Sequence, residues 1–403
     1  MPRTIVILGA MDTKGVEFAF LKSQIEDRGI KTLVVDTGVL GPPLVCPDVG
    51  REEIARAGGV AMNTLLAEKD RGAAMAVMTR GAAVVAKELH AAGKCDGIVS
   101  MGGGAGTAVG TAAMRALPVG VPKVMVTTIA SGDVSPYVGT SDITMMPSIV
   151  DVAGLNRISR VVIANAAGAI CGMVAGKTEP SAEDKPLIAA SMFGNTTPAV
   201  DHARGILERE GFEVLVFHAT GTGGKTMEAL IRSGYIVGVL DMTTTEWADE
   251  ICGGVLGAGP DRLSAAGEKG LPQVVIPGCI DMCNFWAPEN IPEKYKGRLF
   301  YHWNPNVTLM RTTPEENALL GKIFAEKLNG ATGPVAVLIP MRGFSQLDLA
   351  GKPFYWPEAS EAFLHALKAN LQADIPIREI DADINDPAFS SQAAETLLGM
   401  LRK

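Results

Sequence analysis

Residues 97–107 read GIVSMGGGAGT, and this stretch decides the fold class. Its first five residues form a short apolar run typical of a strand, and the glycine-rich turn behind them leads into a helical-looking segment. A strand, a glycine turn and a helix in this order are where an open α/β sheet presents bare backbone N–H groups to an anion. A second such turn, GTGGKT at residues 221–226, lies in the other half of the chain. We therefore expect an α/β protein with an anionic small ligand.

The rhythm of strand, turn and helix runs along the whole chain. In the first half we predict strands at residues 4–8, 31–36, 97–101 and 121–127, then irregular structure over 137–150 and a helix over 151–168. In the second half we predict strands at residues 186–192, 212–217, 235–241, 273–277, 335–340 and 377–380. The fold prediction is two Rossmann-like, doubly wound domains, each with a mostly parallel sheet, related by an internal pseudo-repeat.

Length and composition agree with two domains. The chain has 403 residues, of which 47% are hydrophobic, 5% aromatic and 46 glycine. We place the domains at residues 1–180 and 186–403, joined by the polar segment 176–185. A net charge of −8 argues against nucleic-acid binding. The apolar runs look too short for a membrane span, no signal-peptide pattern is visible, and the six scattered cysteines suit reduced thiols, so we expect a cytoplasmic protein.

The N-terminal half supplies one set of candidate anion-binding residues. Close approach of an anion would explain the density of glycines at residues 102–106, although tight packing of helix on strand is the alternative. Lys14, behind a strand, can reach a phosphate, and Asp36 ends the second strand, where a carboxylate commonly binds ribose hydroxyls. Helix capping by Asp12 or Thr13 and a solvated Asp36 are the alternatives. The candidate residues are Asp12, Thr13, Lys14, Asp36, Gly38, Gly102, Gly103, Gly104, Gly106, Thr107, Thr128, Ser131 and Gly132.

Hydroxyls, a glycine and a carboxylate also gather at residues 127–133. That combination suits phosphate contact or a hydrated Mg²⁺, with Asp133 as a first candidate for a catalytic group. In the second half, His218 precedes the second glycine turn, and we name it as the other catalytic candidate; a satisfied histidine at a strand end is the alternative. The candidates for a second, anionic ligand at the cleft between the domains are Gly221, Gly223, Gly224, Lys225, Thr244 and Glu246.

Six motifs occur together and in order: ILGAMDTKG, VVDTGV, SMGGGAGT, TTIASGD, HATGTGGKTME and DMTTTE. With them the chain resembles the bacterial and plant family that includes the ATP-binding domain of the tomato mosaic virus resistance protein. The resemblance implies two Rossmann-like subdomains, self-association, and ATP bound mainly by the N-terminal one. By motif, it assigns the nucleotide contacts to the N-terminal candidates named above.

The prediction is thus a cytoplasmic, homo-oligomeric ATP-binding protein, with Mg²⁺, whose second ligand is a small anionic metabolite. If it is an enzyme, phosphoryl transfer or ATP-driven ligation is the class that fits. One alternative is a non-catalytic module whose oligomer ATP stabilises. The other is a catabolic enzyme that acts on a sugar acid or a similar carboxylate without ATP, because a glycine turn accepts phosphate and carboxylate alike.

Overall fold

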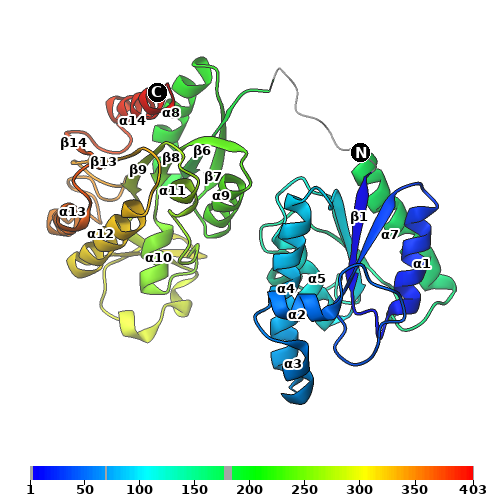
Figure 1. Ribbon diagram of the computed structural model, residues 1–403. Coiled ribbons are helices and arrows are strands. Elements are labelled where there is room, and N and C mark those ends of the chain that lie inside the picture. The colour runs from blue at the N-terminus through cyan, green and yellow to red at the C-terminus, as the bar shows by residue number, and fades with distance from the viewer. Residues whose placement is uncertain (1–2, 69, 177–183, 403) are drawn as a thin grey trace. The chain divides into compact units, whose positions relative to one another are not determined.

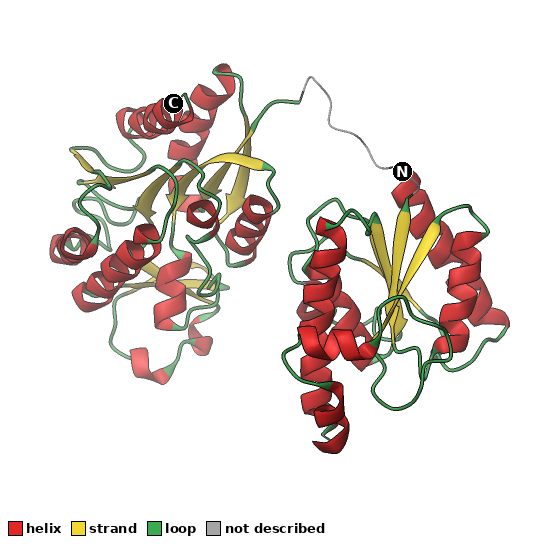
Figure 2. Ribbon diagram, in the orientation of Figure 1, coloured by secondary structure: helices red, strands yellow, loops and turns green. Residues whose placement is uncertain are grey.

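In the computed structural model, two units divide the chain, Met1–Pro180 and Ser181–Lys403, and each has its own sheet and core (Figure 1). The structure describes residues 3–68, 70–176 and 184–402. Most of the predicted linker, residues 177–183, lies outside the described residues. The α/β class and the mainly parallel sheets are as predicted (Figure 2).

The N-terminal unit is built on a parallel sheet whose strand order is β2-β1-β3-β4-β5. Its strands are β1 (Thr4–Gly9), β2 (Lys31–Asp36), β3 (Gly97–Gly102), β4 (Lys123–Thr127) and β5 (Thr144–Pro147). One face packs against α1 (Gly15–Glu26) and α7 (Arg157–Ala175). The other packs against α2 (Arg51–Ala57), α3 (Met62–Glu68), α4 (Arg71–Ala91) and α5 (Gly104–Arg115), and α6 (Ser135–Val138) follows β4.

The strand order fixes where a ligand can enter this unit. From β1 the chain steps outward to β2, then returns past β1 to form β3 on its other side. The loops that leave β1 and β3 therefore diverge to opposite faces of the sheet. A crevice at such a switch point, outside the carboxyl ends of the strands, is the usual ligand site of an open α/β sheet.

The C-terminal unit repeats this order with an addition. Its main sheet runs β7-β6-β8-β9-β13-β14, read from the β7 edge, and all its pairs are parallel. The strands are β6 (Leu187–Met192), β7 (Glu213–His218), β8 (Ile236–Thr243), β9 (Gln273–Gly278), β13 (Val335–Pro340) and β14 (Ile377–Ile380). Between β9 and β13 the chain adds an antiparallel sheet, β10-β12-β11, that the sequence analysis did not predict. Its strands are β10 (Met282–Phe285), β11 (Phe300–Asn304) and β12 (Val307–Arg311).

Helices cover both faces of the second sheet. On one face lie α8 (Thr197–Arg209) and α14 (Pro387–Leu401). On the other lie α9 (Thr222–Arg232), α10 (Glu246–Cys252), α11 (Ala265–Glu268), α12 (Pro314–Asn329) and α13 (Pro357–Asn370). Short 3₁₀ turns occur at η1 (Gly194–Thr196), η2 (Pro288–Asn290) and η3 (Glu293–Tyr295). The first sheet therefore has a topological equivalent in the second, with β6 and β8 in the places of β1 and β3.

Helix α7 is 19 residues long and apolar enough, by length and composition, to cross a membrane. It is the helix among the described residues that passes this test, and the expectation of uniformly short apolar runs missed it. Its residues Ile163, Ala167, Ile170 and Val174 are buried against the sheet. Of its apolar 18-residue window, 39% is buried, so one face of the helix packs on the sheet.

Candidate functional site

A cavity of about 290 Å³ lies at the switch point of the N-terminal unit. It is framed by the carboxyl ends of β1, β2 and β3 and by the first turn of α5. We call it the switch-point cavity, and its lining residues are Ala10, Asp12, Thr13, Lys14, Thr37, Val39, Leu40, Arg71, Met75, Met101, Gly103, Gly104, Ala105, Gly106, Val109 and Asp151. Six of the predicted nucleotide contacts are in this set, brought together from the loops behind β1 and β3.

The first turn of α5 offers its backbone N–H groups to this cavity. Gly103 is the N-cap of the helix, and no side chain caps it within the described part of the chain. A Cβ on Gly104 would have no neighbour within 4 Å, and one on Gly103 would lie 3.6 Å from Oγ1 of Thr128. The backbone therefore opens onto free space beside Gly104, while Thr128 lies at contact distance beside Gly103. Orphan N–H groups and the positive end of the helix dipole together favour an anion here.

Two members of the predicted set have structural roles in the same turn. Gly102 is buried, and a Cβ on it would lie 3.1 Å from Cα of Gly106, so close packing requires a small residue. Thr107 is fully buried, and its hydroxyl bonds to the carbonyl oxygen of Gly103 at 2.8 Å and to Oγ1 of Thr127 at 2.6 Å. These contacts fix the shape of the turn. The residues of the turn that line the cavity are their neighbours, Gly103, Gly104 and Gly106 among them.

The two predicted carboxylates tie the surrounding loops together. Oδ2 of Asp12 accepts hydrogen bonds from the N–H groups of Leu40 and Gly41, at 2.7 and 3.0 Å. Oδ1 of Asp36 accepts from the N–H groups of Met11 and Gly38, at 3.0 and 2.8 Å. Burial raises the pKa of Asp36, against the lowering effect of these hydrogen bonds. Asp36 thus links the loop after β1 to the loop after β2. It is not among the residues that line the cavity.

Gly38 and Lys14 complete this side of the cavity. A Cβ on Gly38 would lie 2.5 Å from Cγ of Asp12, so only glycine lets the loop pass. Nζ of Lys14 donates to the carbonyl oxygen of Val152, which links the β1 loop to the segment before α7. Thr13 beside it is exposed. Lys14 therefore keeps a positive charge on the cavity wall, opposite in sign to a phosphate.

A second cavity, of about 670 Å³, lies at the end of β4 and shares Asp151 with the first. The predicted residues Thr128 and Ser131 line it, and the segment 147–151 forms its other wall. Gly132 is exposed, and its N–H donates to the carbonyl oxygen of Ile129 at 3.0 Å. The two cavities follow the edge of the sheet one after the other.

Asp133, one of the two predicted catalytic residues, is engaged in this loop. It is exposed and accepts from the backbone N–H and the hydroxyl of Ser135, at 2.9 and 2.6 Å. Hydrogen bonds from Ser135 lower the pKa of Asp133. The described residues contain no group of three or more His, Cys, Asp or Glu side chains placed to hold a metal ion.

In the C-terminal unit the second glycine turn already holds an anion, and that anion is Glu246. Oε1 of Glu246 accepts from the N–H groups of Gly221 and Gly224, at 2.7 and 3.0 Å. A Cβ on Gly224 would lie 2.2 Å from Oε2 of Glu246, and one on Gly223 would lie 1.8 Å from the carbonyl oxygen of His218. The predicted turn and the predicted carboxylate are thus each other's partners.

Glu246 also belongs to a buried ionic cluster around Arg262, which the sequence analysis did not identify. Nε of Arg262 donates to Oε2 of Glu246 at 2.7 Å, and its other nitrogens reach Asp241 and Glu228. All four side chains are almost fully buried. The carboxylates raise the pKa of Arg262 well above its usual value, against the opposing effect of burial. Arg262 lies in an irregular loop with no motif around it, so the sequence carries no signal for its role.

The remaining C-terminal candidates do not gather at one place. Thr244 is fully buried, and its hydroxyl donates to the carbonyl oxygen of Ile276 at 3.1 Å. Lys225 is exposed on α9. His218 is exposed at the end of β7, and its ring centroid lies 5.5 Å from that of Phe193. Both residues line a separate cavity of the C-terminal unit.

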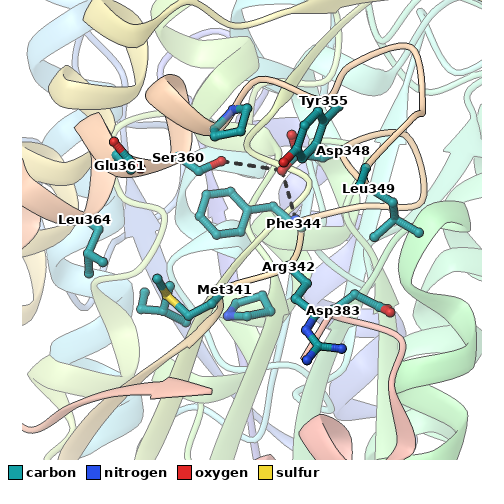
Figure 3. A pocket seen from close by; sticks show the side chains of 15 residues that line it. Met341, Arg342, Phe344, Asp348, Leu349, Tyr355, Ser360, Glu361, Leu364 and Asp383 are labelled. Atoms are coloured by element: carbon teal, nitrogen blue, oxygen red, sulfur yellow. Dashed lines mark hydrogen bonds between the residues drawn. The ribbon is translucent and has the colours of Figure 1, made fainter. Parts of the chain in front are cut away.

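A further cavity of about 450 Å³ opens at the carboxyl end of β13 (Figure 3). Oδ2 of Asp348 accepts from the N–H of Phe344 and the hydroxyl of Ser360, at 3.1 and 3.5 Å. The other oxygen of Asp348 pairs with Arg311 at 3.0 Å. Arg342 is exposed and pairs with Asp381 at 2.7 Å. Asp348 and Arg342, two of the charged groups at this cavity, are thus paired within the protein itself.

Comparisons with known proteins identify the relatives of this chain. Residues 3–179 match the model described as "Uncharacterised protein family (UPF0261) N-terminal domain", and residues 185–401 match the corresponding C-terminal domain. A UPF0261 protein from Clostridium tetani is 50% identical over 404 residues, covering 100% of both chains. Another, from Rhizobium meliloti, is 48% identical over 97% of both chains.

The plant relative is longer than this chain. The "ToMV susceptible protein tm-1(GCR26)" of Solanum lycopersicum is 41% identical over 340 residues, which are 83% of this chain and 45% of the tomato protein. Among solved structures, UDP-N-acetylglucosamine 2-epimerase from Rickettsia bellii is 12% identical, covering 100% of this chain and 95% of that one, with a TM-score of 0.23. A TM-score this low carries no functional argument.

Proposed function

The chain belongs to the UPF0261 family over both of its units, and from that premise we propose that its N-terminal unit binds ATP in the switch-point cavity. The observation that carries the proposal is the uncapped first turn of α5, whose glycines open onto the cavity at the switch point of the sheet. Backbone donors at this place are suited to phosphate oxygens. The family resemblance supplies the choice of ATP among nucleoside phosphates.

The walls of the cavity fit the two ends of a nucleotide. Val39, Leu40 and Met75 contribute apolar surface to the lining that a base could contact. Lys14 and Arg71 add positive charge to the lining. The second cavity, with the hydroxyls of Thr128 and Ser131, continues along the sheet edge and offers room for the outer phosphates and a hydrated Mg²⁺. Such an ion would neutralise phosphate charge through its own water and the nucleotide.

We propose retention of ATP without turnover as the mode of action, which is the non-catalytic alternative of the sequence analysis. Asp12 lines the cavity and Asp36 lies behind it, and each accepts two backbone N–H groups through one oxygen. Their other oxygens accept no hydrogen bond among the described residues, but they are buried. Asp151, which also lines the cavity, accepts from the N–H of Val152. A general base needs a carboxylate or imidazole free to accept a proton from the attacking group. We also propose that the protein self-associates and is cytoplasmic. Sedimentation with and without ATP tests the self-association.

The test is thermal unfolding of the full chain with ATP and Mg²⁺, ADP, NAD and a panel of sugar acids. Ligand at about 100 times its Kd stabilises the folded state by about 2.7 kcal/mol. We expect stabilisation by ATP in the wild type and in Gly104→Ala, because the space beside Gly104 is open. Gly104→Glu places a negative charge beside the phosphates and should weaken ATP binding at least tenfold.

The ligands in this test also distinguish ATP binding without turnover from the other two functions considered, an ATP-dependent enzyme and an ATP-independent carboxylate enzyme. Stabilisation by a sugar acid and not by any nucleotide would replace the proposal with an ATP-independent carboxylate enzyme. Equal stabilisation of Gly104→Glu and Gly104→Ala by ATP would show that the nucleotide binds elsewhere. Steady release of phosphate from ATP by the purified protein would reject retention without turnover.

A further inference from the structure

A cavity of about 430 Å³ lies within the C-terminal unit, where the antiparallel sheet approaches the ends of β6 and β7. We call it the aromatic cavity, and its lining residues are Phe193, Gly194, Asn195, His218, Thr220, Leu256, Trp286, Trp303, Asn304, Val307 and Leu309. Its volume is within the range of roughly 300 to 1,000 Å³ that small-molecule sites occupy. It lies beside β6, the strand that corresponds to β1 at the switch point of the first sheet.

Aromatic side chains are concentrated here although the chain is poor in them. Aromatic residues make up 5% of the sequence, and only four of these are tryptophans. Two of them, Trp286 and Trp303, line this cavity and are 49% and 46% exposed. Phe193 and His218 add two rings whose centroids are 5.5 Å apart. Half-exposed indoles provide flat apolar surface on which a planar ring can stack.

One polar group at the cavity lacks a partner. Asn195 is 1% exposed, and its Oδ1 accepts no hydrogen bond within the described part of the chain. Its Nδ2 contacts Sδ of Met282 at 3.6 Å, and its carbonyl oxygen accepts from Asn385 at 2.9 Å, so the residue is held in place. A buried acceptor without a donor is costly, and native structures rarely keep one without a reason. Oδ1 is itself covered, so a ligand N–H or O–H would satisfy it once the side chain turns toward the cavity.

The surroundings argue against an anionic occupant. The cavity lining contains neither lysine nor arginine. The neighbouring glycine turn, which would otherwise attract an anion, is occupied by Glu246. A ligand here would thus be held by stacking and by one hydrogen bond rather than by charge.

We propose that the aromatic cavity binds a small, uncharged, planar aromatic molecule that carries an N–H or O–H donor. The ring packs against the indoles of Trp286 and Trp303, and the donor pairs with Oδ1 of Asn195. This site is separate from the proposed nucleotide site and lies in the other unit, so either proposal can fail without the other.

The test uses ¹⁹F NMR of the full chain labelled with 5-fluorotryptophan. The four signals are assigned by changing each tryptophan to phenylalanine in turn. Indole is the probe, and 1-methylindole, which lacks the N–H donor, is its matched partner. We expect indole to shift the signals of Trp286 and Trp303 and to leave those of Trp247 and Trp356, which do not line the cavity, unchanged. We expect 1-methylindole to bind at least tenfold more weakly.

Variants separate the contributions of the two contacts. Asn195→Ala should abolish the preference for indole over 1-methylindole while the stacking shifts remain. Val307→Phe fills the cavity and should remove the shifts, whereas His302→Phe, on a neighbouring exposed residue outside the lining, should keep them. The proposal is wrong if indole leaves both signals unmoved, if glucose shifts them as strongly as indole does, or if Val307→Phe binds indole like the wild type.

Discussion

At the scale of single residues, the C-terminal unit shows how a protein can fill its own anion site. The N–H groups of Gly221 and Gly224 point at a carboxylate, as the sequence pattern suggests, but the carboxylate belongs to Glu246. The same side chain then binds Arg262 through its second oxygen. A motif that predicts anion binding therefore does not say whether the anion comes from outside.

We predict that Glu246→Ala mainly destabilises the fold. It leaves two buried N–H groups unpaired and removes one of the carboxylates around Arg262, which should lower the free energy of unfolding by about 3 kcal/mol. Lys225→Ala, on the exposed surface nearby, should change it by less than about 0.5 kcal/mol. Urea unfolding measures both. A Glu246→Ala protein as stable as the wild type would contradict the structural role of this side chain.

Asp249 provides a prediction about pH. Its carboxyl is fully buried, and burial raises its pKa from 3.8 to about 7. Between these values the folded protein binds a proton that the unfolded chain does not hold, so the free energy of unfolding falls as the pH rises and levels off above about pH 7. The expected slope from this group is at most about 1.4 kcal/mol per pH unit.

Asp249→Asn should remove this contribution. Nδ2 of Asn284 now donates to Oδ2 of Asp249, and Oδ1 of Asn284 lacks a partner in the described chain. If the side-chain amide of Asn284 turns over, its Oδ1 can accept from the introduced amide, so the packing should survive. Urea unfolding of wild type and variant from about pH 5 to about pH 7.5 gives the difference in slope. Parallel curves for the two proteins would mean that Asp249 titrates at its ordinary pKa.

At the scale of elements, the connection from β5 to α7 contains an unusual turn. The N–H of Val150 donates to the carbonyl oxygen of Ser148 at 2.7 Å across Ile149, whose φ is +65°. This is a γ-turn of the rare, strained kind, at a β-branched residue that is 74% exposed in the second cavity. Strain of this kind is often stored beside a binding site.

We predict that Ile149→Gly stabilises the protein. Removing the left-handed strain should raise the free energy of unfolding by about 1 kcal/mol. Leu40→Gly is the matched control, because Leu40 is 76% exposed without a positive φ, and the loss of a side chain there should lower stability slightly. The two changes should therefore move the thermal midpoint in opposite directions. A decrease for Ile149→Gly would show that the turn carries little strain.

The elements that the sequence predicted well are those with local signals. Strands such as β2 (Lys31–Asp36) and β13 (Val335–Pro340) agree with their predicted ranges because their apolar runs end at turn residues. The predicted irregular segment 137–150 instead contains β5, a short edge strand that depends on pairing with β4. The helix predicted over 151–168 is α7 (Arg157–Ala175), which begins where Asn156 caps it. The antiparallel sheet was missed because its strands are short and form through tertiary pairing.

In the candidate sites, too, local sequence signals could be predicted and tertiary contacts could not. The gathering of Lys14 with the glycines of residues 103–106 could be predicted, because the ends of adjacent parallel strands meet at one edge of a sheet. The anchoring roles of Asp12 and Asp36 could not, because they depend on which backbone N–H groups the loops bring near. The aromatic cavity depends on the unpredicted antiparallel sheet, and the sequence gives no sign of it.

At the scale of the whole molecule, the chain consists of two versions of one strand order, the second enlarged by the antiparallel sheet and an extra edge strand. The two main apolar clusters of the N-terminal unit take all their residues from positions 5–174. The clusters of the C-terminal unit take theirs from positions 187–401. Each unit thus has the core that a domain needs to fold by itself.

We predict that residues 1–180, produced alone, fold and keep the affinity for ATP of the full chain within about threefold, because every residue of the proposed nucleotide site lies in this segment. Residues 181–403 should fold as well and show no thermal stabilisation by ATP. Calorimetric titration of both segments and of the full chain with ATP measures this. Binding by the full chain but by neither segment would mean that the nucleotide needs residues from both units, and would reject a site built from the N-terminal unit alone.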